Sequence, residues 1–143
     1  MEKISHSAEE TKQIGHEIAA TITSPPILSL HGDLGPGKTT LVQGIAEGLG
    51  IKEEITSPTF TLMNVYEITN YKLQITNLVH IDTYRLKNQQ ELIDIGAEDY
   101  LGQPGVVTII EWPEKIEKLL QNKKIISITL EHLDADERRI TIE

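Results

Sequence analysis

The sequence predicts an α/β fold in which a mainly parallel central sheet is flanked by helices and followed by a C-terminal β-hairpin. Apolar runs of strand length alternate with segments whose apolar residues recur at helical spacing. Residues 125–130 and 138–143 alternate in hydrophobicity on either side of a polar turn, which is the pattern of a hairpin. A length of 143 residues with 38% hydrophobic content suits one globular domain, residues 1–143, with one core.

The first predicted element is a helix that begins at Ser7. Glu10 follows Ser7 at the spacing of a capping box, and we expect the helix to end before Pro25 and Pro26. The apolar stripe of this helix consists of Thr11, Ile14, Ile18 and Ala19.

The next element is a strand at 27–30, which leads into the sequence His-Gly-Asp-Leu-Gly-Pro-Gly-Lys-Thr-Thr at 31–40. This stretch completes the pattern Gly-x-x-x-x-Gly-Lys-[Ser/Thr] and precedes a helix that closes at 48–50, so it predicts a phosphate loop of a P-loop NTPase. Glycines let N–H groups turn toward phosphate oxygens, Lys38 can reach the β and γ phosphates, and the Thr39 hydroxyl can ligate Mg²⁺. Pro36 has no N–H and provides one donor fewer. The alternative is a glycine-rich turn that binds nothing.

We expect nucleotide contacts along the whole loop. These contacts are assigned to Asp33, Leu34, Gly35, Pro36, Gly37, Lys38, Thr39 and Thr40.

Two later apolar runs each end in an acid. Residues 78–82 end at Asp82, and residues 106–112 contain Glu111 followed by Trp112. The carboxyl ends of parallel strands meet at one edge of a sheet, which puts both acids and Thr39 within reach of one metal ion. Asp82 is the candidate Walker-B acid, although an Asp after a strand also caps turns. Trp112 either packs in the core or belongs to this site.

The remaining predicted elements are a loop, a strand, a hairpin and two helices. Residues 56–61 form a loop with four hydroxyl side chains, which either satisfy main-chain groups in a turn or act as a switch near the nucleotide. Strand 60–66, a polar hairpin at 68–75 and a helix at 89–100 follow. Pro113 starts a short helix.

Composition and charge exclude several classes of function. A net charge of −9 and a pI near 5.0 argue against charge-driven binding of nucleic acid or anionic membranes, so any contact with RNA is expected to be indirect. The chain has no cysteine, no apolar run of membrane-spanning length and no signal-peptide core, which favours the cytoplasm. The five histidines lack metal-ligand spacing and are expected at surface or loop positions. Residues 122–125 lack the acid of a guanine-specific Asn-Lys-x-Asp element, so adenine is the expected base.

Several stretches together resemble one family, the bacterial tRNA threonylcarbamoyladenosine biosynthesis ATPase TsaE, also called YjeE. The resemblance spans most of the chain. It is carried by the stretches at 32–40, 57–62, 80–86, 96–100 and 111–114. It implies a P-loop fold, binding of ATP and Mg²⁺, slow hydrolysis, and a partner complex of TsaB with TsaD that modifies adenosine 37 in tRNAs reading codons that begin with A.

The resemblance also implies individual roles. Lys38 looks like the phosphate lysine, Thr39 and Glu111 like magnesium ligands, and Asp82 like the acid needed for turnover, which we also count among the metal-site residues. Trp112 is similar to a functional tryptophan of the family. Thr59, within the loop at 57–59, resembles part of a switch that senses the γ phosphate, and Thr11 with its neighbours looks like part of the adenine pocket. Pro36 replaces the commoner alanine, and the stretch at 68–76 looks longer and more polar than usual.

Two other functions compete with this ATPase. A small-molecule kinase usually closes arginines over the transferred phosphoryl group, yet the chain has only Arg85, Arg138 and Arg139. A nucleotide-gated scaffold would bind ATP without a hydrolysis-dependent output. Kinetic measurements separate the scaffold from the ATPase.

Overall fold

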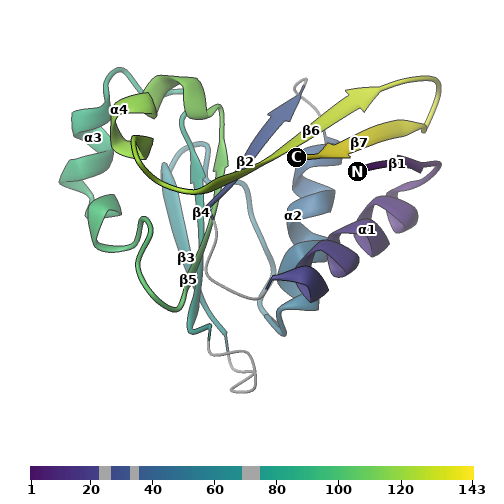
Figure 1. The fold of residues 1–143 in the computed structure, drawn as a ribbon, viewed down its shortest axis with the longest axis horizontal. Helices are drawn as coiled ribbons and strands as arrows, with labels where there is room; N and C mark the ends of the chain where they lie inside the picture. The colour runs from purple at the N-terminus through teal and green to yellow at the C-terminus, as the bar shows by residue number, and fades with distance from the viewer. Residues whose placement is uncertain (23–26, 33–35, 69–74) are drawn as a thin grey trace.

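The computed structural model describes residues 1–22, 27–32, 36–68 and 75–143, and within these residues a seven-stranded sheet lies between two groups of helices (Figure 1). The order of the strands across the sheet is β1-β7-β6-β2-β5-β4-β3. The strands are β1 (Glu2–Ser5), β2 (Ile27–Gly32), β3 (Met63–Glu67), β4 (Asn77–Asp82), β5 (Val106–Glu111), β6 (Ile125–His132) and β7 (Arg138–Ile142).

The centre of the sheet is parallel. Strands β6, β2, β5 and β4 are neighbours that all pair parallel, whereas the pairings β3 with β4, β6 with β7 and β7 with β1 are antiparallel. The predicted α/β class with a C-terminal hairpin, β6–β7, is therefore confirmed. Strand β1 was not predicted, because four residues at a sheet edge carry little hydrophobic pattern. It brings the N-terminus beside the C-terminus, where the Met1 amino group donates to Ile142 O at 2.9 Å.

Helices cover both faces of the sheet (Figure 1). One face carries α1 (Ala8–Thr21) and α2 (Pro36–Gly48), and the other carries α3 (Gln89–Asp94), η2 (Ala97–Asp99), η3 (Pro113–Ile116) and α4 (Glu117–Leu120). Ser7 is the N-cap of α1, since Ser7 Oγ accepts from Glu10 N at 3.1 Å, and the Glu10 carboxylate accepts at 2.6 Å from His6 N, one residue before the cap of the predicted capping box. Pro25 and Pro26 lie outside the described residues.

The alternation of side chains along each strand builds two cores. Leu28 and Leu30 of β2 pack in the cluster under α1 and α2, whereas Ile27 packs in the cluster under α3 and α4. On β4 and β5 the residues that share the α2 face include His80, Asp82 and Glu111, which follow the same alternation. The α2 face therefore carries the polar strand ends that were predicted to form the site.

Helices α1 and α2 approach each other main chain to main chain. A Cβ added to Gly44 would lie 2.2 Å from Lys12 O, and one added to Gly15 would lie 2.7 Å from Ile45 N. Larger side chains at these positions would push the helices apart. This close crossing holds α2, and with it the end of the phosphate loop, against the sheet.

Three predicted elements differ in their bounds. The helix predicted at 89–100 ends at Asp94 and resumes as η2, because Gly96 has φ 90° and interrupts it. The strand predicted from residue 60 begins at Met63, after Leu62 with φ 68°. The ends of the predicted hairpin at 68–75 are joined by Ile68 N donating to Thr76 O at 2.9 Å, and residues 69–74 lie outside the described part. No described helix combines the length and the hydropathy needed to cross a membrane.

Candidate functional site

The phosphate loop lies between β2 and α2, as its sequence context predicts. Gly32 ends β2 with φ 142°, and a Cβ there would lie 2.5 Å from Leu130 O of β6, so this position requires glycine. Pro36 is the first residue of α2. Asp33, Leu34 and Gly35 lie outside the described residues, and the nucleotide contacts assigned to them remain predictions.

Lys38 is a buried cation with only long polar contacts among the described residues. Its side chain is 5% exposed, and its Nζ lies 3.3 Å from Gly32 O and 3.8 Å from Glu111 Oε1. The same Nζ lies 4.4 Å from the centroid of the Trp112 ring. A desolvated ammonium gains strongly from an anion at closer range. Thr39 and Thr40 follow Lys38 in the first turns of α2, and both are half-buried.

The structure brings the two predicted acids together. Asp82 and Glu111 are Cα partners at the ends of β4 and β5, and they are 5% and 6% exposed. Glu111 Oε2 lies 2.8 Å from His80 Nε2. Asp82 Oδ1 accepts from Tyr84 N at 2.9 Å, and its Oδ2 accepts from Thr59 Oγ1 at 3.0 Å. His80 therefore holds the Glu111 carboxylate, and Tyr84 N together with Thr59 holds the Asp82 carboxylate.

This donor set fits Mg²⁺, a hard cation that prefers carboxylate and hydroxyl oxygens. In the described part of the chain, no three His, Cys, Asp or Glu side chains are grouped as a metal site. Mg²⁺ is usually held by one or two carboxylates together with substrate phosphates rather than by a cage of protein ligands. Glu111, Asp82 and the hydroxyl of Thr39 are the residues that could hold it.

The hydroxyl-rich loop makes side-chain contacts within the loop and with Asp82, and its role as a switch remains a prediction. Thr61 Oγ1 donates to Asn64 Oδ1 at 2.8 Å, which is a local turn contact. Ser57 Oγ lies 2.7 Å from Thr59 Oγ1, and Thr59 in turn donates to Asp82. These contacts connect the loop to Asp82 at the predicted metal site.

Trp112 lies beside Lys38 and belongs to neither apolar cluster of the described residues. Its main chain is left-handed, with φ 62°, which is unusual for a side chain of this size. The ring faces Lys38, and its centroid is 5.4 Å from that of the Tyr84 ring. Of the two alternatives for this residue, core packing is therefore wrong.

Thr11 is buried at the start of α1. It is 3% exposed, and its hydroxyl lies 2.7 Å from Ser5 Oγ and 3.2 Å from Ser7 O. These contacts join α1 to the end of β1. The contact of Thr11 with adenine remains a prediction.

Sequence reasoning missed three residues around the phosphate loop. His80 was expected at the surface or in a loop, which is wrong, because it is fully buried in β4. Its position two residues before Asp82 places both on one face of the strand, and this spacing is the signal that could have revealed it. Tyr84 contacts Trp112, and Arg138 Nε lies 3.5 Å from the point that a Cβ on Gly37 would occupy. Arg138 comes from the distant C-terminal hairpin, so no local pattern predicts its place.

A second histidine lies in a chain of side-chain contacts on the other face of the sheet. His31 Nε2 is 3.1 Å from Ser29 Oγ, and His31 Nδ1 is 3.2 Å from Glu114 Oε1. This order of groups is that of a Ser-His-Glu triad, but Ser29 is only 3% exposed in the middle of β2. A nucleophile must reach its substrate, so these contacts are structural.

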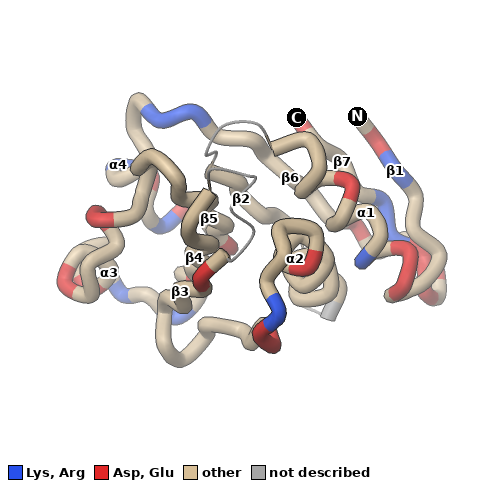
Figure 2. Tube along the Cα trace, turned by 90° about the horizontal axis from the view of Figure 1, so that it is seen from below, with Lys and Arg blue, Asp and Glu red and all other residues tan. Residues whose placement is uncertain are grey.

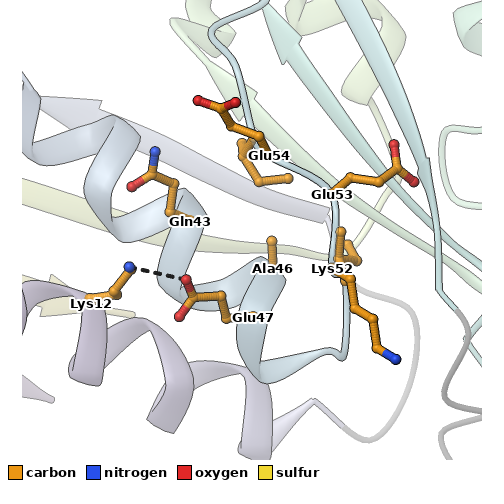
Figure 3. A pocket seen from close by; sticks show the side chains of 9 residues that line it. Lys12, Gln43, Ala46, Glu47, Lys52, Glu53 and Glu54 are labelled. Carbon is orange, nitrogen blue, oxygen red and sulfur yellow. Dashed lines mark ion pairs between the residues drawn. The ribbon is translucent and has the colours of Figure 1, made fainter.

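A separate pocket of about 310 Å³ lies between α1, α2 and the segment at 51–55 (Figure 3). Its lining includes Lys12 and Glu47, whose ion pair measures 3.0 Å. Ala46 in the lining is eight residues beyond Lys38, or about 12 Å along α2, so the pocket is distinct from the phosphate loop. Hydrogen bonds from His16 and Lys12 hold the pKa of Glu47 below its usual value, and the same carboxylate raises the pKa of Lys12.

Comparisons with known proteins identify the family of this chain. The family model described as threonylcarbamoyl adenosine biosynthesis protein TsaE matches residues 5–140. The tRNA threonylcarbamoyladenosine biosynthesis protein TsaE of Bacillus subtilis (strain 168) is 40% identical over 133 residues, which cover 93% of this chain and 78% of that protein. The protein of the same name from Treponema pallidum (strain Nichols) is 38% identical over 142 residues, with 99% of both chains covered.

A solved structure has the same fold. The crystal structure of Bacillus subtilis YdiB superposes with a TM-score of 0.77 at 33% identity, and the match covers 99% of this chain and 83% of that one. The family model extends over nearly the whole sequence, and these relatives match it over most of their own length. The chain, with its phosphate loop and paired strand-end acids, therefore belongs to the TsaE family of threonylcarbamoyl adenosine biosynthesis proteins.

Proposed function

We propose that this protein is a Mg²⁺-dependent ATPase required for threonylcarbamoylation of adenosine 37 in tRNAs that read codons beginning with A. In this proposal the 143 residues act as one domain in the cytoplasm and hydrolyse ATP to drive or reset a complex of TsaB and TsaD. The observation that carries it is the meeting of Lys38, Asp82 and Glu111 in a chain of the TsaE family.

Binding is assigned to the phosphate loop and the first turn of α2. Lys38, which has no close anionic partner among the described residues, opposes the charge of the β and γ phosphates. Glu111 and the Thr39 hydroxyl hold Mg²⁺, with Asp82 beside them. Magnesium, when bound, neutralises charge on the phosphate oxygens. The contacts from Asp33, Leu34, Gly35, Pro36, Gly37, Thr40 and Trp112, and that of Thr11 with adenine, belong to this proposal.

Hydrolysis is assigned to Asp82. The oxygen of a water molecule bonds to the γ phosphorus while the bond from that phosphorus to the β–γ bridging oxygen breaks, which yields ADP, inorganic phosphate and a proton. Asp82 orients this water and accepts its proton. The hydrogen bonds from Tyr84 N and Thr59 Oγ1 support this role because they keep the Asp82 carboxylate in one orientation.

The contact between Thr59 and Asp82 also supports a switch. Loss of the γ phosphate changes the charge next to Asp82, and the loop at 56–61 is tied to that residue through Thr59. A loop that is ordered in one nucleotide state and loosened in the other presents two shapes to a partner protein. We assign the coupling between ATP hydrolysis and the TsaB–TsaD complex to this loop.

Chemistry on the tRNA is assigned to the partners. Within the described residues, Lys and Arg positions are scattered among Asp and Glu positions along the chain (Figure 2), and the net charge of the sequence is −9. Binding to a phosphate backbone needs clustered positive charge. We therefore propose that tRNA meets this protein only indirectly, through the complex.

A reconstituted assay of repeated tRNA modification tests the proposal. TsaB and TsaD alone are expected to stop after early rounds, and addition of this protein with ATP and Mg²⁺ is expected to restore continued turnover. ATP hydrolysis is expected to rise when the partners are added. Asp82→Ala and Glu111→Ala are expected to fail in this rescue.

Two outcomes would overturn the proposal. Rescue by a variant shown not to hydrolyse ATP would show that the protein acts as a nucleotide-gated scaffold and not as a resetting ATPase. Transfer of labelled γ phosphate to a small molecule, rather than to water, would make the protein a kinase.

A further inference from the structure

His80 is a fully buried histidine with one polar contact among the described residues. It lies in β4, and its Nε2 is 2.8 Å from Glu111 Oε2 on the neighbouring strand. Its other ring nitrogen, Nδ1, is buried and has no hydrogen-bond partner in the part of the chain that the structure describes. The role proposed above for Lys38, Asp82 and Glu111 does not use this residue.

This pattern of contacts decides where the ring carries its proton. An N–H at Nδ1 would be a buried donor without a partner, which is costly, whereas an unprotonated nitrogen leaves only a lone pair unmatched. Nε2 is therefore the ring nitrogen placed to act as a donor, and it faces Glu111 Oε2. An N–H at Nε2 donates to Glu111 Oε2, which accepts.

The hydrogen bond constrains the orientation of the Glu111 carboxylate. With Oε2 held by His80, the other oxygen, Oε1, is the one that lies 3.8 Å from Lys38 Nζ at the phosphate loop. A glutamate has three rotatable side-chain bonds, and a buried donor on one of its oxygens removes most of that freedom. The same carboxylate without His80 would be free to fold onto Lys38 and close the site.

We propose that His80 is a positioning residue that holds Glu111 with Oε1 directed to the metal-binding side of the phosphate loop. This inference rests on the proposed function, in which Glu111 is a ligand of Mg²⁺. His80 itself touches neither metal nor nucleotide and acts only through the carboxylate.

A set of substitutions at position 80 tests the hydrogen bond rather than the volume of the ring. Calorimetric titration of ATP at a series of free Mg²⁺ concentrations gives the Mg²⁺ concentration for half-maximal tightening. His80→Leu removes the donor and is expected to raise this concentration about 10- to 100-fold. His80→Gln keeps an N–H at about the position of Nε2 and is expected to stay near wild type. His80→Asn is polar but too short to reach Glu111, so it is expected to behave like His80→Leu.

A matched control separates positioning from general damage to the sheet. Thr108 on β5 is also fully buried, and its hydroxyl has no partner among the described residues, but it points to the opposite face from Glu111. Thr108→Val is expected to leave the Mg²⁺ dependence unchanged. Affinity for ATP in the presence of a chelator is expected to be the same in all four variants and the wild type.

The proton on His80 Nε2 gives a second test, which needs no ligand. In the nucleotide-free and metal-free protein, ¹⁵N NMR is expected to place His80 Nε2 in the range of protonated ring nitrogens. An Nε2 without a proton would overturn the inference, because it could not donate to Glu111. Equal Mg²⁺ dependence of His80→Gln and His80→Asn would overturn it as well, even if His80→Leu fails to fold.

Failure of the underlying function has a different signature. If ATP binding by the wild type does not depend on Mg²⁺, or Glu111→Ala leaves that dependence intact, the metal role of Glu111 is wrong. If Glu111→Ala abolishes the dependence while His80→Leu and His80→Asn keep it, only the positioning role of His80 is wrong.

Discussion

The molecule contains the same three residue types, Lys, His and Glu, in contact at two places that differ in burial. The buried trio consists of Lys38, His80 and Glu111, with side chains that are 5%, 0% and 8% exposed. The surface trio consists of Lys12, His16 and Glu47, with side chains that are 32%, 37% and 46% exposed. The contact from histidine to glutamate is nearly identical, at 2.8 Å in the buried trio and 2.9 Å in the surface trio.

The contact from lysine to glutamate differs. It measures 3.0 Å in the surface trio but 3.8 Å in the buried trio, where the lysine faces the phosphate loop. The surface groups are solvated, so their contacts join α1 to α2 with only a small gain in stability. The buried lysine is 5% exposed, and among the described residues no anion lies closer to it than 3.8 Å, which makes the buried trio suited to a phosphate ligand. Four substitutions, taken from the largest expected effect to the smallest, test this comparison.

Asp82→Ala removes the second carboxylate beside the buried trio. Hydrolysis of ATP is expected to fall about 10²- to 10⁴-fold, the usual contribution of a general base, while ATP affinity is largely retained. Release of phosphate under single-turnover conditions measures the chemical step. Asp94→Ala, at the exposed end of α3, is the control and is expected to hydrolyse ATP normally. Native hydrolysis by Asp82→Ala would remove this residue from the chemistry.

Lys38→Ala removes the buried cation. ATP affinity is expected to fall roughly 100-fold, because loss of one partner of a buried charge pair leaves the phosphates without their counter-charge. Calorimetry measures the change directly. Lys3→Ala, which breaks a surface pair with Glu17, is the control and should bind ATP as the wild type does. Unchanged affinity in Lys38→Ala would make the buried trio as inert as the surface trio.

Glu111→Ala tests the carboxylate of the buried trio. The Mg²⁺-dependent part of the ATP affinity is expected to fall about 10- to 100-fold, since one charged contact contributes about 1.5–3 kcal/mol. Glu47→Gln, at the matching position of the surface trio, is expected to leave the Mg²⁺-dependent part of the ATP affinity unchanged. An equal loss in both variants would show that the effect comes from net charge rather than from the site.

The last prediction concerns stability. Glu47→Gln is expected to lower the free energy of unfolding by less than about 1 kcal/mol near neutral pH, because the pair is exposed and screened. The contacts with His16 and Lys12 depress the pKa of Glu47, so their contribution is present above the unfolded-state pKa, near 4.5, and is lost as the pH falls through the lower folded-state value.

Urea unfolding of the wild type and Glu47→Gln at several pH values measures this contribution. The difference between the two proteins should shrink below pH 4.5. A difference that grew in acid would contradict the depressed pKa.

Much of the architecture was determined by the sequence alone. The alternation of apolar runs and helical stripes predicted the parallel centre and the C-terminal hairpin, and the loop pattern ending in Gly37, Lys38 and Thr39 placed the turn between β2 and α2. These features depend on side-chain periodicity and on the main-chain freedom of glycine, both of which are local properties. Asp82 and Glu111 were also predicted to lie together, because the carboxyl ends of parallel strands lie at the same edge of a sheet.

Other features were decided only by the tertiary structure. Strand β1 is stabilised by β7 from the opposite end of the chain, and Arg138 reaches Gly37 from the C-terminal hairpin. The sequence treats His80 and His16 as equivalent histidines, and Glu111 and Glu47 as equivalent acids. Packing removes one set from water and leaves the other in it, and the strength of a charge interaction depends on that environment. Burial is a sum over contacts from the whole chain, so a local pattern such as the spacing of His80 and Asp82 can indicate it but cannot determine its extent.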